Sequence, residues 1–149
     1  MTFTVAQKDE ITVYHNESLF FKAIVKNGIK FNLQFFKDDN LILETNSLTI
    51  IFFKKVWIKE QKLPYDIEFA KQKGLWGFVV AFRNHLIYSK LRPLQNPAYR
   101  FYLDEQLIAE VHNGKGITTG RHYIVSTTTE DEILNLYLLI AFVIQFIPL

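Results

Sequence analysis

A basic stretch with a tryptophan, residues 53–62, carries the side chains best suited to bind a partner. If the stretch is a regular strand, Lys55, Trp57 and Lys59 share one face, because side chains alternate along a strand. An indole between ammonium groups suits a membrane interface, where the ring lies at headgroup level and the ammonium groups meet anionic phosphate. We therefore predict an anionic-surface site formed by Lys54, Lys55, Trp57 and Lys59.

Two other interpretations of this stretch stay open. A single strand of nucleic acid could stack on Trp57 while the lysines contact its backbone, although we favour phospholipid over nucleic acid. Alternatively, Trp57 belongs to the protein core and the lysines merely flank it.

Histidines and paired acids are the other residue types that could do chemistry. His112 and His122 lie near the ends of expected neighbouring strands, and with Glu110 they would supply three metal ligands. Exposed imidazoles at strand ends are the more ordinary interpretation, so we predict no metal site. The acids at 38–39 and 130–132 fall in a turn and at a helix start, where they have structural reasons to be.

The sequence contains no motif of an enzyme. It has no HExxH, no glycine-rich phosphate loop and no GxSxG. It contains no cysteine, which excludes disulfides, thiolate metal sites and cysteine nucleophiles. We therefore predict a protein that is not an enzyme and needs no cofactor. The first ten residues do not resemble a signal peptide, so we expect a cytoplasmic location.

The charge is unevenly distributed along the chain. The net charge is only +2, but residues 54–100 hold ten Lys and Arg against three acids, a local excess of seven positive charges (10 − 3). Such a segment can be attracted to an anionic surface such as phospholipid. It could equally be a solvated wall whose charges are balanced by neighbouring strands.

Alternating apolar residues and turn signals predict about twelve strands. Residues 29–35 alternate cleanly, and the Asn27-Gly28 pair before them is a strong hairpin signal. A break is expected at Asn46-Ser47, followed by one long strand. The expected strands cover residues 3–5, 11–14, 20–26, 29–35, 41–45, 48–59, 65–69, 76–83, 85–90, 99–103, 107–111 and 122–126.

A wholly apolar helix is expected to follow the strands. Residues 133–149 contain no charge, and only Asn135 and Gln145 are frankly polar. Thr129 with Glu132 three residues later fits a capping box, which places the helix start near residue 130. A helix that is apolar on every side lies either inside its own protein or in a membrane.

These elements predict a mainly β fold, a closed antiparallel barrel around a buried helix, as a single domain over residues 1–149. A barrel of about twelve strands has a lumen too wide for strand side chains alone to fill, and the helix would fill it. In residues 76–83, the small residues Gly77, Val79 and Ala81 share a face that could lie against the helix.

The order of elements resembles the tubby C-terminal-like superfamily, which includes tubby domains, phospholipid scramblases and LURP-one-related proteins. The match in local pattern is a hairpin over residues 99–111, then Tyr123-Ile124-Val125, then acids, then the helix. The resemblance implies a helix threaded through the barrel, and it implies phosphoinositide binding because tubby domains bind these lipids. It carries over no functional residue.

The sequence thus favours a non-enzymatic binding module for anionic phospholipid at a membrane surface. One alternative is a tail-anchored membrane protein with residues 133–149 in the bilayer, a length at the short end of the spanning range. Another is a domain that binds a protein partner. The sequence does not indicate the oligomeric state.

Overall fold

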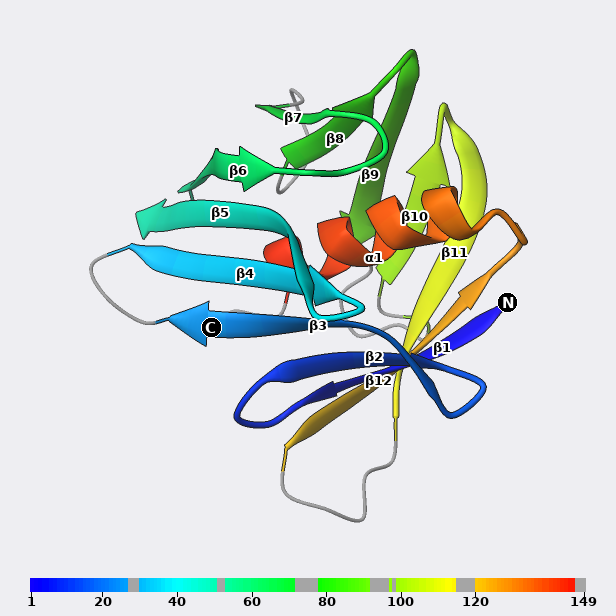
Figure 1. Cartoon of the computed structure of the whole chain (residues 1–149). Helices are drawn as coiled ribbons and strands as arrows, with labels where there is room; N and C mark the ends of the chain where they lie inside the picture. The colour runs from blue at the N-terminus through cyan, green and yellow to red at the C-terminus, as the bar shows by residue number, and fades with distance from the viewer. Residues whose placement is uncertain are drawn as a thin grey trace.

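Twelve antiparallel strands form a single curled sheet in the described part of this computed structural model (Figure 1). The structure describes residues 1–26, 30–50, 53–71, 78–91, 97, 99–114 and 120–146, without the side chains of residues 49, 50, 53, 54, 71, 78, 91 and 146. The strands are β1 Thr2–Gln7, β2 Ile11–His15, β3 Ser18–Lys26, β4 Phe31–Lys37, β5 Asn40–Ile50, β6 Phe53–Gln61, β7 Ile67–Lys71, β8 Phe78–Phe82, β9 His85–Leu91, β10 Tyr99–Leu103, β11 Gln106–Asn113 and β12 Arg121–Thr127.

The strand order is β6-β5-β4-β3-β2-β1-β12-β11-β10-β9-β8-β7. Each strand therefore pairs with its neighbours in sequence, apart from the pairing of β1 with β12 and the gap in pairing between β6 and β7. The sheet curls into a nearly closed barrel made of two meanders, which are joined along β1 and β12 (Figure 1). This confirms the predicted mainly β architecture.

Tight turns connect several hairpins. Both central residues have positive φ in the turns at Asn16-Glu17, Asp38-Asp39 and Asp104-Glu105. Such mirror-image turns twist the chain in the same sense as the strands, and Asn and Asp tolerate the left-handed region well. The acids at 38–39 therefore have a structural function in this turn. The Asn27-Gly28 turn lies outside the described residues.

The predicted boundary at Asn46-Ser47 is wrong. Strand β5 continues through both residues to Ile50, and β6 begins at Phe53. Asn46 accepts a hydrogen bond from the side-chain amide of Asn32 on β4, at 3.0 Å, and Ser47 is buried. Polar residues that suggested a turn thus lie within a paired strand, because cross-strand contacts satisfy them.

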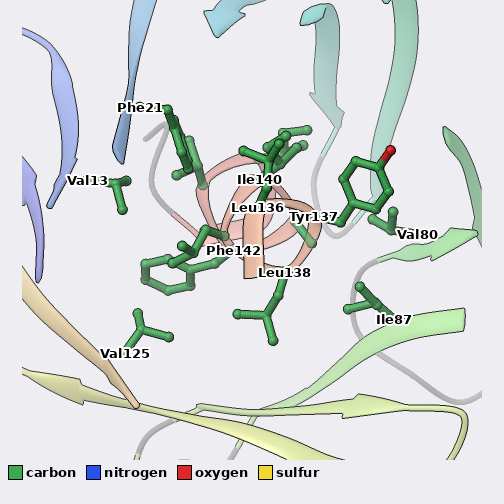
Figure 2. Close-up of a cluster of buried hydrophobic side chains, with 14 of the residues drawn as sticks. Val13, Phe21, Val80, Ile87, Val125, Leu136, Tyr137, Leu138, Ile140 and Phe142 are labelled. Atoms are coloured by element: carbon green, nitrogen blue, oxygen red, sulfur yellow. The ribbon is translucent and has the colours of Figure 1, made fainter. Parts of the chain in front are cut away.

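The helix α1, Glu132–Phe146, runs through the middle of the barrel (Figures 1 and 2). Its residues Leu136 to Ile144 are all at most 5% exposed. Figure 2 shows Val13, Phe21, Val80, Ile87 and Val125 of the surrounding strands pointing toward the helix. Burial of each large apolar side chain stabilises the fold by about 1.5–3 kcal/mol, so the helix is the centre of the hydrophobic core, as predicted.

The start of α1 differs from the predicted capping box. Asp131, rather than Thr129, is the cap: its Oδ1 accepts hydrogen bonds from the amides of Ile133 at 2.9 Å and Leu134 at 3.2 Å. Thr129 Oγ1 instead accepts from the amide of Asp131 at 3.1 Å. The carboxylate of Asp131 satisfies two free N–H groups and complements the helix dipole, and aspartate is preferred over threonine as a cap.

The two side-chain amides of α1, Asn135 and Gln145, have partners near its two ends. Asn135 is fully buried, and its Nδ2 donates to the carbonyl of Thr129 at 3.0 Å. At the other end Ser89 on β9 donates to Oε1 of Gln145 at 3.0 Å. Because a buried polar group is costly unless it is hydrogen-bonded, these contacts favour one axial position of the helix in the barrel.

The β8 face that contacts the helix is the opposite of the predicted one. The centroid of the Phe82 ring lies 4.5 Å from the centroid of the Tyr137 ring, in an edge-to-face arrangement. Val80 also belongs to the core around the helix. The small-residue face that was expected to contact the helix is therefore not the one that meets it. Of that face, Gly77 lies outside the described residues.

The gap in pairing between β6 and β7 is bridged by side chains. The side-chain amide of Gln61 pairs with the backbone of Ile67 as a neighbouring strand would. Its Oε1 accepts from the amide of Ile67 at 2.9 Å, and its Nε2 donates to the carbonyl of Ile67 at 3.4 Å. In the connection between these strands, the hydroxyl of Tyr137 donates to the carbonyl of Tyr65 and accepts from its amide, both at 2.7 Å. Burial raises the pKa of Tyr137, so the hydroxyl stays protonated.

Candidate functional site

The predicted site lies on β6, at one end of the sheet order. Lys55 and Lys59 are exposed and Trp57 is half-buried. Val56 and Ile58 alternate with them and pack against the core. Trp57 is therefore on the outer face of the barrel and does not belong to the core. The side chain of Lys54 lies outside the described part of the chain.

Two lysine ammonium groups lie over the ring of Trp57. The ammonium of Lys55 lies 5.0 Å from the ring centroid, and the ammonium of Lys30 lies 5.2 Å from it. Each is within the range of a cation–π contact, worth about 0.5–1 kcal/mol at an exposed site. Lys30 stands just before β4 and was missed from the sequence, since only the register of β4, β5 and β6 brings it to Trp57.

A polar network on the same face surrounds the carboxylate of Glu44 on β5. Its Oε2 accepts hydrogen bonds from Asn32 at 2.8 Å and from Gln34 at 3.3 Å. The ammonium of Lys59 lies 3.6 Å from the same oxygen. The hydrogen bond from Asn32, followed by Gln34 and Lys59, holds the pKa of Glu44 below its ordinary value despite burial.

This arrangement divides the lysines of this face into two kinds. Lys59 is partly neutralised by Glu44, and the pair contributes little net charge. Lys30 and Lys55 contact the face of an indole, so they keep their full charge toward solvent. We call Lys30, Lys55 and Trp57 the outer-face patch. Lys26 adds a further exposed cation nearby, because it lies opposite Asn32 in the pairing of β3 with β4.

The histidines are placed by their strands. His112 lies opposite Ile124, whereas His122 lies two residues earlier on β12 and its carbonyl accepts from the amide of Gly114. His112 Nε2 is 3.8 Å from Glu110 Oε2. Over the described residues, no group of three His, Cys, Asp or Glu side chains could hold a metal ion. His122 also borders a cleft of about 520 Å³ beside the β1–β2 turn, away from β6.

One histidine–carboxylate pair was missed from the sequence. His85 Nδ1 lies 2.6 Å from Asp104 Oδ2, and Asp104 Oδ1 accepts from the amide of Leu86 at 2.9 Å. The hydrogen bond with His85 holds the pKa of Asp104 below its ordinary value. The pair joins the start of β9 to the β10–β11 turn, a structural function that explains both residues. The two residues are 19 positions apart, and only the pairing of the strands brings them together, so the sequence alone does not indicate this pair.

Within the residues that the structure describes, no helix is long and apolar enough to cross a membrane. Comparisons with protein-family models, curated proteins and solved structures found no match for this chain.

Proposed function

We propose that this chain is a non-enzymatic binding module that contacts anionic phospholipid through its outer-face patch. The observation that carries the proposal is the half-buried ring of Trp57 in contact with the ammonium groups of Lys30 and Lys55 on an outer face of the barrel. An amphipathic ring favours the headgroup region, and the two ammonium groups close to it would meet lipid phosphate.

The charges on this face favour an anionic partner. Each lysine near an anionic membrane surface contributes about 1 kcal/mol of attraction. Lys30 and Lys55 supply two such charges, and Lys26 lies within the same part of the sheet. The carboxylate of Glu44 is already engaged by Asn32, Gln34 and Lys59, so it opposes the patch less than a free carboxylate would.

The resemblance to the tubby-like group supports the same class of function. The resemblance rests on a β-barrel with a final apolar helix inside it, which is the architecture of this chain. We propose that the chain shares that group's fold and its affinity for anionic lipid headgroups, with a peripheral location on the cytoplasmic side of a membrane. Scramblase activity is not part of the proposal, because that subgroup has features outside the domain.

A purely structural function of the β6 lysines is the main competing explanation. β6 is an edge strand in the order of the sheet, and lysines on edge strands prevent unwanted pairing with other chains. If that were their function, reversal of the charges would change aggregation and leave vesicle binding as it was. The tail-anchored alternative would require residues 136–144 to leave the core in which they are buried.

Vesicle flotation of the full-length chain tests the proposal. We expect it to float with vesicles of phosphatidylcholine and phosphatidylserine, and not with phosphatidylcholine alone. Binding should weaken as salt rises, because exposed charges are screened within about 8–10 Å at physiological ionic strength. The double variant Lys30→Glu, Lys55→Glu should bind well over tenfold more weakly, since two attractive contributions of about 1 kcal/mol each are lost. Trp57→Ala should also weaken binding.

A matched control separates a defined site from general attraction. Lys8→Glu with Lys90→Glu changes the net charge equally, on exposed residues outside β4–β6. It should bind nearly as well as the unmodified chain. Lys59 is left intact, because its reversal would place two carboxylates together at Glu44. Equal losses in both double variants would refute the outer-face patch. Equal flotation with both vesicle types, or none with either, would refute lipid binding and favour a protein partner.

A further inference from the structure

A cleft at the mouth of the barrel, beside the first turn of α1, is distinct from the outer-face patch. Its volume is about 300 Å³. Its apolar walls come from β3, β5, the segment after β6 and the helix: Phe20, Ile42, Leu63, Pro64, Ile133 and Leu136. Ile133 is 36% exposed although it lies in the first turn of the most apolar element of the chain. The cleft therefore leaves apolar surface accessible at the end of the core.

Two lysines, Lys37 and Lys62, line this cleft, and they differ in their partners. The ammonium of Lys37, the last residue of β4, lies 4.3 Å from the centroid of the Phe20 ring and donates to the Phe20 carbonyl at 3.2 Å. Among the described residues, no carboxylate lies within ion-pair distance of it. Lys62, also at the cleft, is instead 3.3 Å from Glu60. A lysine ammonium has three N–H donors, so Lys37 can donate to a further acceptor in the cleft.

We propose that the cleft binds a single-chain amphiphilic anion, such as a medium-chain carboxylate. Its alkyl chain would cover Ile42, Leu63 and Leu136, and its carboxylate would accept hydrogen bonds from Lys37. Charge-assisted hydrogen bonds of this kind are stronger than neutral ones. A volume of about 300 Å³ is at the lower end of small-molecule sites, so the cleft fits one short chain and excludes a two-chain phospholipid.

Two carboxylates at the rim of the cleft also affect how tightly an anion should bind. Asp38 and Glu132 border the cleft and are both exposed. Their carboxylates repel an anion, but water and salt screen exposed charges more than the half-buried Lys37. Removal of the Glu132 charge should therefore tighten the binding of an anion, whereas removal of the Lys37 charge should weaken it. A cationic amphiphile would show the opposite pattern.

Titration of the isotope-labelled full chain with decanoate, below the concentration at which it forms micelles, tests this site by NMR. Saturable shifts are expected at the amides of Leu63, Ile133 and Leu136. Octanoate should bind roughly tenfold more weakly than decanoate, because two methylene groups are worth about one factor of ten. Decanol, which has the same chain without the charge, should bind several-fold more weakly than decanoate.

Substitutions then test whether Lys37 is the cation that binds the carboxylate of decanoate. Lys37→Gln should weaken decanoate binding several-fold, Lys37→Arg should retain it, and Glu132→Gln should tighten it. Lys55→Gln is the matched control, since it removes one charge from the outer-face patch and should leave decanoate binding unchanged. Shifts that appear only once micelles form, equal affinity for decanol and decanoate, or unchanged binding by a folded Lys37→Gln protein would each overturn the proposal. This result is independent of vesicle binding.

Discussion

The hydroxyl of Tyr137 provides a direct test of how the central helix is held to the barrel. Tyr137→Phe removes one oxygen that makes two hydrogen bonds of 2.7 Å with the backbone of Tyr65, while the ring keeps its contact with Phe82. A neutral hydrogen bond contributes about 0.5–1.5 kcal/mol net, so two give about 1–3 kcal/mol. Because Tyr65 is 37% exposed, water can replace part of the loss. We expect the free energy of unfolding to fall by about 1.5 kcal/mol.

Urea unfolding measures this loss, and hydrogen exchange locates it. In the variant, the amide of Tyr65 should exchange faster, because it loses its acceptor. Tyr123→Phe is a suitable control: it removes a hydroxyl from another buried ring, whose described contact is with the ring of Phe142. That change should cost less than the first. If Tyr137→Phe left both stability and Tyr65 exchange unchanged, the hydroxyl would not hold the helix to the connection between β6 and β7.

Two further predictions concern the core and the outer-face network. Leu138→Asp would bury an unpaired charge at a fully buried helix position. The burial costs several kcal/mol or more, which is much of the typical free energy of unfolding of a domain. A soluble, cooperatively folded variant would contradict the buried helix. The pKa of Glu44 is lowered in the folded state, so its contribution to stability is present above its ordinary pKa of 4.5 and is lost as the pH falls through the lower folded value. Denaturation measured against pH should therefore show a smaller acid-dependent loss for Glu44→Gln than for the unmodified chain, and identical profiles would rule out this contribution.

The architecture could be predicted because its signals are local. The alternation of residues 29–35 predicted a strand with one buried face, which the structure has as β4, and the uncharged run after Glu132 predicted a helix. The boundaries of the strands were harder to predict from the sequence. Asn46 resembles a turn residue by type, and only its hydrogen bond with Asn32 from the next strand explains its place inside β5.

The candidate site could be predicted only in part, for the same reason. Lys55, Trp57 and Lys59 lie on one short strand, so their common face follows from the period of a strand. Lys30 and Glu44 reach the same face through the pairing of β4 with β5 and of β5 with β6. That register includes a bulge between Glu44 and Thr45, which no pattern within a single strand reveals. The ion pair that partly neutralises Lys59 therefore could not be predicted from the sequence.

The pairing of β1 with β12 has a consequence for how the chain reaches this fold. The two meanders are joined by a contact between segments more than a hundred residues apart, and the helix that fills them follows β12. During synthesis, each meander can form by local hairpins, but its apolar inner face has no partner until the helix emerges. Folding dominated by such distant contacts is slow, and exposed apolar sheet is prone to aggregate. We therefore expect the nascent chain to need protection by a chaperone until α1 has left the ribosome.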